Sequence, residues 1–293
     1  MEKGIRAFVP EHLCKFLQPG TVGEILLVTS SGIYLRMDER ILLLCDADWG
    51  VLPIGIGIEN FPDALAQLRP LQGQYVLVTE KQLTLPTGSI LLMPQHPQNK
   101  EMEGCTPQIP YIRQAAEALA ALRKQRGFSM LVIPLVLGDS MDDAVKQNPY
   151  CVLAYTQLSK LMAALSQGAT GEIGNCVEKL LGLGFGLTPS ADDVLLGMLW
   201  IFYTLSAQHM ELATVFRGCI TQLCEQRTNQ ISTAYLKAIS AGAPFERMES
   251  VYRGLCGKEP LNIHPLVEIG SSSGSEMLLG MLIALRIYGY DPS

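Results

Sequence analysis

The chain has 293 residues, of which 48% are hydrophobic and 17% are charged, and its net charge at pH 7 is −6. This composition excludes a disordered chain and the basic surface of a nucleic-acid-binding protein. The longest apolar runs, residues 194–205 and 277–285, are shorter than the roughly 20 residues that cross a bilayer, so they predict buried helices and no membrane partner. The first residues lack the pattern of a secretory signal, and we expect a cytoplasmic protein.

Short strands separated by tight turns are predicted from residue 22 to residue 93. The apolar alternation predicts strands at 24–29, 32–37, 40–45, 74–79, 82–85 and 89–93. Pro53, Gly55 and Gly57 interrupt the apolar segment 52–58, so we expect this segment at a sheet edge or in contact with the other domain rather than in a central strand. Together these strands predict a β-meander or a small barrel.

Helical periodicity prevails beyond a proline-rich segment, residues 94–110. We therefore expect an α+β protein with a β-rich domain at residues 1–100 and a mostly helical domain at residues 101–293. The apolar run 130–137 fits either a lone strand or a buried connection. Helices are predicted at 112–122, 152–165, 173–181, 194–205, 210–225, 231–239, 247–255 and 277–288.

The cysteines and histidines are scattered along the chain. The eight cysteines form no C-x-x-C pair, and the four histidines form no H-x-x-x-H motif. This spacing supports neither a zinc site nor a disulfide framework, and it predicts free, buried thiols in a reducing compartment.

Two segments of the helical domain follow one plan, in which a loop of small residues leads to a serine, an acid three residues later and an apolar helix. Residues 190–199 (SADDVLLGML) and 273–282 (SGSEMLLGML) are identical at six of ten positions, with Gly197 and Gly280 in register. A glycine- and hydroxyl-rich loop that opens into a helix leaves backbone N–H groups unpaired at the positive end of the helix dipole. Each segment therefore predicts an anion-binding helix start.

A structural explanation remains open for both segments, because each fits a capping box in which serine and acid bind each other's backbone N–H groups. The pairs that fit are Ser190 with Asp193 and Ser273 with Glu276. Thr188 followed by Pro189 offers another start for the first helix. Capping does not require the alternating glycines of residues 182–186 or the three serines at 271–273, and such loops usually mark a close approach of the backbone to another group.

The runs 181–197 (LGLGFGLTPSADDVLLG) and 269–280 (IGSSSGSEMLLG) resemble a family, long filed as a domain of unknown function, that includes one subunit of oxamate carbamoyltransferase of the allantoin pathway. Residues 227–238 resemble a third element of that family, and the resemblance covers nearly the whole chain. The family usually has glycine where Ala191 stands and aspartate where Glu276 stands. Neither change removes a carboxylate or a capping hydroxyl, so we expect the site chemistry to persist while the substrate can differ.

The resemblance implies a transferase of allantoin degradation, within purine catabolism, that moves a carbamoyl group between phosphate and the amine of oxamate. It also implies that the reaction belongs to an assembly of several different subunits, so other subunits are expected partners, and it does not say which subunit contains the chemistry. Carbamoyl phosphate and oxamate are both anions, which agrees with a small anionic substrate at the two helix starts.

We predict that the backbone of residues 184–190 and 271–274 binds phosphate or carboxylate oxygens. The predicted substrate-binding residues are Gly184, Gly186, Thr188, Ser190, Arg227, Thr228, Ser272, Ser273 and Gly274. The predicted catalytic residues are Asp192, Asp193 and Glu276. Successive helical residues point about 100° apart, so one of the two aspartates is expected to cap and the other to face a cavity.

Asp192 is expected to be the freer carboxylate, with a role as general base, as substrate-orienting group or as Mg²⁺ ligand. A carboxylate beside an anion repels it, so a Mg²⁺ at Asp192 or the guanidinium of Arg227 is expected to intervene. A solvated helix-end charge explains Arg227 equally well. Capping of the following helix explains Thr228, Asn229 and Ser232 with fewer assumptions.

A different class of function stays open. The low charge content and the apolar helices also suit a non-catalytic scaffold or regulatory subunit that binds partner proteins. No nucleotide cofactor is expected, because the glycines at 182, 184 and 186 do not follow the G-x-G-x-x-G pattern and no βαβ alternation surrounds them.

Overall fold

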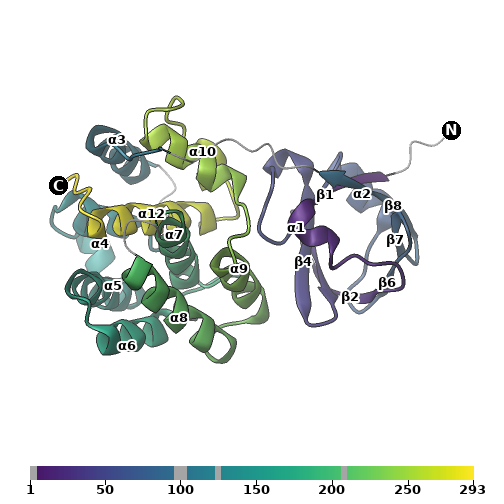
Figure 1. The fold of residues 1–293 in the computed structure, drawn as a ribbon, viewed down its shortest axis with the longest axis horizontal. Coiled ribbons are helices and arrows are strands. Elements are labelled where there is room, and N and C mark those ends of the chain that lie inside the picture. The colour runs from purple at the N-terminus through teal and green to yellow at the C-terminus, as the bar shows by residue number, and fades with distance from the viewer. Residues whose placement is uncertain (1–4, 96–103, 123–126, 206–209) are drawn as a thin grey trace. The chain divides into compact units, whose positions relative to one another are not determined.

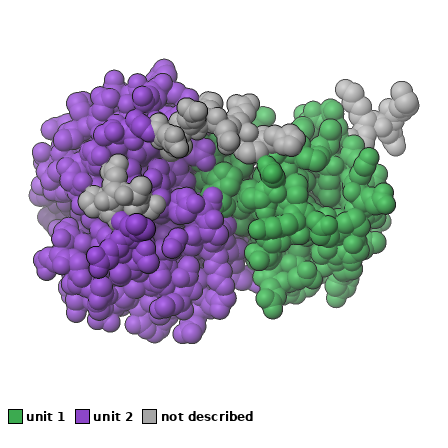
Figure 2. Space-filling view, in the orientation of Figure 1, with its two compact units in different colours: residues 1–101, 243–247 green, residues 102–242, 248–293 purple. Residues whose placement is uncertain are grey.

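The computed structural model describes residues 5–95, 104–122, 127–205 and 210–293. The chain divides into two compact units: residues 1–101 with 243–247, and residues 102–242 with 248–293 (Figure 2). The boundary expected near residue 100 falls within 96–103, outside the described residues. Residues 243–247 group with the first unit, a return of the chain that the expected domains 1–100 and 101–293 do not include.

The first unit is a closed β-barrel, which confirms the predicted β-rich N-terminal part (Figure 1). Around the barrel the strand order is β1-β5-β4-β3-β2-β6-β7-β8, and β8 pairs in parallel with β1. Its strands are β1 (Ile5–Pro10), β2 (Val22–Val28), β3 (Gly32–Met37), β4 (Arg40–Asp46), β5 (Gly55–Ile58), β6 (Tyr75–Val78), β7 (Gln82–Leu85) and β8 (Gly88–Gln95). Its short helices are α1 (Glu11–Cys14), η1 (Ala47–Trp49) and α2 (Phe61–Leu68).

Strand β5 contradicts the expectation for the segment 52–58. All four of its residues are buried, and it pairs antiparallel with β1 and parallel with β4, so its expected place at a sheet edge is wrong. A Cβ at Gly55 would lie 2.7 Å from the Cβ of Leu52, and one at Gly57 would lie 2.9 Å from the Cα of Ala47. These glycines mark a close approach of neighbouring chain and do not break the strand.

The second unit is helical, as predicted. Its longer helices are α3 (Ile109–Ala120), α5 (Pro149–Gln167), α6 (Thr170–Leu180), α7 (Ser190–Thr204), α8 (Met210–Arg227), α9 (Gln230–Ser240), α10 (Glu246–Leu255) and α12 (Ser273–Ile287). Its shorter elements are η2 (Ser129–Leu131), the π-helix η3 (Ile133–Leu137), α4 (Asp143–Lys146) and α11 (His264–Val267). The run 130–137 is therefore helical, which excludes the lone strand and confirms the buried connection.

Helices α7 and α12 form the centre of the second unit (Figure 1). Every residue of α7 from Ser190 to Phe202 is buried, as is every residue of α12 from Gly274 to Leu285. A helix that is apolar on all sides needs neighbours on all sides, which the surrounding helices provide. Among the described residues, no helix combines the length and hydropathy that crossing a bilayer requires.

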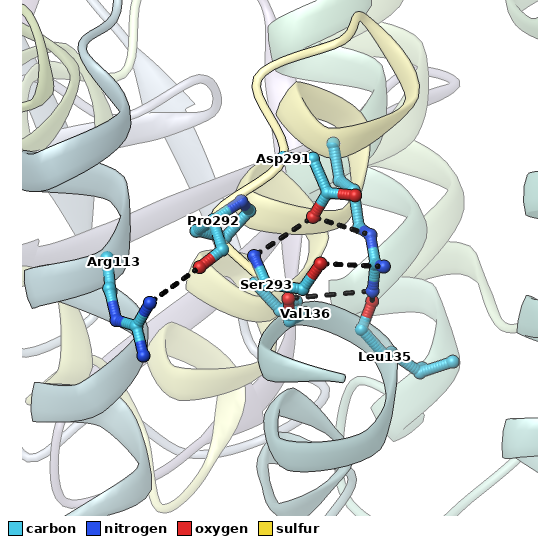
Figure 3. A network of polar contacts seen from close by, with 7 residues as sticks. Arg113, Leu135, Val136, Asp291, Pro292 and Ser293 are labelled. Carbon is cyan, nitrogen blue, oxygen red and sulfur yellow. Dashed lines mark hydrogen bonds and ion pairs between the residues drawn. The ribbon is translucent and has the colours of Figure 1, made fainter. Parts of the chain in front are cut away.

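The guanidinium of Arg286, in the last turn of α12, ties the end of the chain to η3 (Figure 3). It donates to the carbonyl of Leu135 at 2.8 Å and to Ser293 Oγ at 3.4 Å, and it pairs with Asp291 at 3.2 Å. Three-quarters of this side chain is covered, since its exposed fraction is 24%.

Arg286→Met is expected to lower the free energy of unfolding by about 1–3 kcal/mol, because methionine keeps most of the stem but leaves the buried carbonyl without its charged donor. Urea unfolding measures the loss. Arg113→Met is the control: Arg113 donates to the carbonyl of Pro292 at 3.4 Å but is 58% exposed, so its loss is expected to stay below about 1 kcal/mol. Equal losses in the two variants would contradict the anchoring role of Arg286.

Candidate functional site

The glycine loop, residues 181–189, precedes α7 and has backbone conformations that residues other than glycine rarely adopt. Gly182, Gly184 and Gly186 have φ angles of 81°, 112° and 115°, in the region that favours glycine. Pro189 is the N-cap residue of α7, and the hydroxyl of Thr188 donates to Asp193 at 2.8 Å. The helix therefore begins at Ser190, so the alternative start with Pro189 at the first helical position is not observed, and the capping box of Ser190 with Asp193 is not formed.

The serine loop, residues 270–273, leads into α12 in a similar way. Ser272 is the N-cap residue, and its hydroxyl donates to Glu276 Oε2 at 3.1 Å. The N–H of Gly274 donates to the carbonyl of Ile269 at 3.1 Å. Glu276 thus hydrogen-bonds Ser272, whereas the predicted capping box pairs it with Ser273.

The two helix starts meet. Thr188 Oγ1 lies 3.1 Å from Ser273 Oγ, so the hydroxyls that precede and open the two helices are hydrogen-bonded to each other. The side chain of Ser273 also hydrogen-bonds Asp193, and that of Ser190 hydrogen-bonds Glu276. The first serine of each helix therefore binds the acid of the other helix. The serine and acid that each capping box pairs within one segment thus find their partners in the other segment.

Further along, the backbones of α7 and α12 are in close contact. A Cβ at Gly197 would lie 2.0 Å from the carbonyl oxygen of Met277, and one at Gly280 would lie 2.0 Å from that of Val194. No side chain fits at either position, which explains why the two glycines occupy the same place in both segments. The repeated motif is therefore a packing device as well as a helix start.

All three predicted catalytic acids are buried, with exposed fractions of 2% for Asp192, 2% for Asp193 and 1% for Glu276. Burial raises the pKa of Asp192 and that of Glu276 above their ordinary values, because it disfavours the charged form. Burial together with the nearby Glu276 charge raises the pKa of Asp193 well above its ordinary value. The structure thus holds Asp193 and Glu276 as a coupled pair of acids between the two helices.

Asp192 is not the freer carboxylate, and that expectation is wrong. Its Oδ1 accepts the N–H of Gly182 at 2.8 Å, and its Oδ2 accepts the hydroxyl of Thr228. Both oxygens therefore have partners within the chain. The reason is that Asp192 faces the glycine loop and α9, whereas the neighbouring Asp193 faces α12.

The surroundings of Asp192 do not fit a magnesium ion. Mg²⁺ requires oxygen acceptors, whereas an N–H and a hydroxyl hydrogen point at this carboxylate. Among the described residues, no group of three or more His, Cys, Asp or Glu side chains could hold a metal ion.

Two further predicted residues have structural partners. Arg227 forms an ion pair with Glu178 on α6, and the structure does not bring its guanidinium to the buried acids. Its carbonyl oxygen would lie 2.4 Å from a Cβ at Gly182, so the backbone of Arg227 packs on the glycine loop. Thr228 holds Asp192, as described above.

Sequence reasoning missed Phe128 and one of the contacts of Asn229. The N–H of Phe128 donates to Glu276 Oε1 at 2.9 Å, beside Gly127, where a Cβ would clash with the same carboxylate oxygen. Asn229 caps α9, as expected, and its amide also donates to the carbonyl of Leu187 at 3.0 Å. A backbone donor such as Phe128 leaves no local sequence signal.

The tip of the glycine loop presents backbone N–H donors. Within the described part of the chain, the backbone N–H groups of residues 184–188 form no hydrogen bond with another residue. Phe185 is 71% exposed at this tip, and its ring lies 4.6 Å from that of Tyr150. An exposed row of unpaired N–H groups beside a helix start is a geometry that binds oxyanions.

Residues 180–285 match the model of the family described as oxamate carbamoyltransferase subunit AllH. The resemblance to the AllH family is confirmed over this segment, while the expected coverage of nearly the whole chain stays a prediction. The matched segment begins at the end of α6 and ends within α12, so it contains both helix starts and the buried acids. A family of subunits implies other subunits as partners of this AllH-like chain. No solved structure matches the chain.

Proposed function

We propose that this chain is a subunit of a carbamoyl-transferring enzyme that resembles oxamate carbamoyltransferase, and that its two joined helix starts bind a small anionic substrate. The observation that supports this most is the contact between the starts of α7 and α12 at Thr188 and Ser273, inside the segment that matches the AllH family. Two loops that are 83 residues apart in sequence thereby present their donors at one place.

The unpaired N–H groups of residues 184–188 bind the oxygens of carbamoyl phosphate or of oxamate in this proposal. When the amine of the acceptor attacks the carbamoyl carbon, phosphate leaves, and charge-assisted hydrogen bonds from fixed N–H groups stabilise the charge that develops on it. Other subunits supply whatever groups the reaction needs beyond this loop.

The buried acids act as positioning residues. Asp193 and Glu276 join the two helix starts, and Asp192 holds the glycine loop at Gly182. Because its raised pKa favours the neutral form of Asp193, the cluster has less negative charge than its composition suggests.

A binding experiment and an assay test the proposal together. Inorganic phosphate or oxamate is expected to raise the melting temperature of the chain by mass action, with a gain of about 2.7 kcal/mol at a hundred times the dissociation constant. The chain is then purified with its natural partner subunits, and carbamoyl transfer is measured with and without it.

Gly186→Ala is expected to lower transfer at least about tenfold, because a Cβ at Gly186 forces a change of its φ of 115° and would lie 3.0 Å from the carbonyl oxygen of Thr188. The melting temperature should fall by only a few degrees, since the loop tip is exposed. Gly171→Ala is the control, because a Cβ there, near the start of α6, meets nothing within 4 Å. Unchanged transfer in Gly186→Ala would remove the loop from the site.

A scaffold or regulatory subunit is the second candidate function, and the internal pairing of the three acids favours it. It predicts that Gly186→Ala leaves transfer unchanged and that phosphate and oxamate give no thermal shift. It also predicts that Phe185→Ser, at the exposed ring pair with Tyr150, weakens co-purification with the partner subunits.

A further inference from the structure

A groove of 410 Å³ lies between α8 and α9, separate from the two helix starts. Arg217, Gly218 and Thr221 line it from α8, and Lys237 and Ser240 line it from α9. A second groove of 160 Å³ adjoins it, because both include Thr214 and Arg217. We call the first the polar half of this depression and the second its apolar half, after the side chains that line them.

The described residues that line this depression include Arg217 and Lys237 and no acid. Lys237 pairs with Glu225 and lies in the last turn of α9, where it offsets the partial negative charge of that helix end. Arg217 is exposed, and its guanidinium forms no ion pair or hydrogen bond with any residue of the ranges that the structure describes, although its carbonyl accepts from the hydroxyl of Thr221. Arg217 is therefore the cation that remains available to a ligand, at the junction of the two halves.

Ser240 supplies a neutral donor on the polar side. Its exposed fraction is 9%, and its Oγ is buried without a hydrogen-bond partner in the described part of the chain. A buried hydroxyl without a partner is uncommon, because desolvation is not compensated. A ligand oxygen in the groove would give this hydroxyl an acceptor.

The apolar half has the size of a small ring. Leu199, Phe202, Tyr203 and Met210 line it, and Tyr203 and Met210 are exposed at 43% and 71%. A cavity of about 150 Å³ with an apolar lining accommodates benzene. Exposed apolar side chains beside a free arginine favour a ligand with an apolar body and an anionic end.

We propose that this depression binds a small organic anion, with its carboxylate or phosphate on Arg217 and Ser240 and its apolar group against Tyr203 and Met210. A planar guanidinium binds either oxyanion through paired hydrogen bonds. The apolar half then selects ligands that have a ring or a short aliphatic group over the bare inorganic ion.

Calorimetric titration of the full chain with phenyl phosphate, benzoate and inorganic phosphate tests this proposal. Phenyl phosphate or benzoate is expected to bind more tightly than inorganic phosphate, and the stronger of the two identifies the preferred oxyanion. Arg217→Gln is expected to raise the dissociation constant about tenfold or more, since it removes a charged hydrogen-bonding partner. Lys160→Gln, which removes an exposed cation from α5, is the control and should change binding little.

Gly218→Leu provides a variant that blocks the groove without changing charge. A Cβ at Gly218 meets nothing within 4 Å, so leucine extends into open groove, and helix propensity improves. Binding should be lost while the melting temperature is maintained, and Gly171→Leu on α6 should bind as the unmodified chain does. Gly186→Ala should also leave this binding unchanged, which separates the groove from the glycine loop. Absence of saturable binding, or wild-type affinity in Arg217→Gln and Gly218→Leu, would overturn the proposal.

Discussion

Gly197→Ala and Gly280→Ala are each expected to destabilise the helical unit by about 3 kcal/mol or more. The added methyl carbon would lie 2.0 Å from a carbonyl oxygen of the facing helix, and a backbone atom cannot move aside as a flexible side chain does. The helices α7 and α12 would have to separate along their whole contact, and the buried acids at their starts would lose the serines that they bind.

Urea unfolding followed by circular dichroism measures this effect through the shift of the midpoint. Gly218→Ala is the matched control, because it makes the same change in a helix where the new methyl meets nothing within 4 Å. That control is expected to gain about 0.5–1 kcal/mol from helix propensity. Similar midpoints for Gly197→Ala and Gly218→Ala would show that the helices do not touch as described.

The stability of the helical unit is expected to increase as the pH falls towards the ordinary pKa values of Asp193 and Glu276. The pKa of Asp193 is raised well above its ordinary 3.8 by burial and by the Glu276 charge, and burial raises that of Glu276. Between the unfolded and the raised folded pKa, the native state binds more protons than the unfolded state, so stability is lost as the pH rises through this window. Each proton contributes a slope of at most about 1.4 kcal/mol per pH unit.

Asp193→Asn is expected to flatten this dependence, because the amide cannot ionise and no longer repels Glu276. The measurement is the difference in unfolding free energy between wild type and variant at several pH values. Asp143→Asn is a control of opposite sign: hydrogen bonding to Lys146 lowers the pKa of this exposed acid, so its contribution disappears at low pH. A pH-independent difference between wild type and Asp193→Asn would contradict the coupled pair.

The barrel strands were predictable wherever the chain alternates between apolar and polar residues and turns tightly. Residues 32–37 and 82–85 were predicted with the same bounds as β3 and β7. Strand β5 was not predictable, because its glycines resemble strand breakers unless the packing of Leu52 and Ala47 against them is known. The local sequence indicates the conformational preference of a residue but not which parts of the chain pack against it.

The same limit applies to the candidate site. The doubled pattern of serine, acid and glycine was enough to predict two special helix starts. Their contact was not in the pattern, because the serine of each capping box binds the acid of the other helix, 83 residues away along the chain. A capping box predicted from one segment assumes that its serine and its acid bind within that segment. Here each serine binds the acid of the other helix instead.

The exchange of serines between α7 and α12 also has a consequence for biosynthesis. When Asp193 leaves the ribosome, Glu276 is still 83 residues from doing so, which at about 5–20 residues per second is a delay of roughly 4–17 s. During that interval the apolar side chains and the acids of the nascent α7 lack their native neighbours. Chaperone binding to stalled nascent chains should therefore persist until α12 has emerged, and then fall.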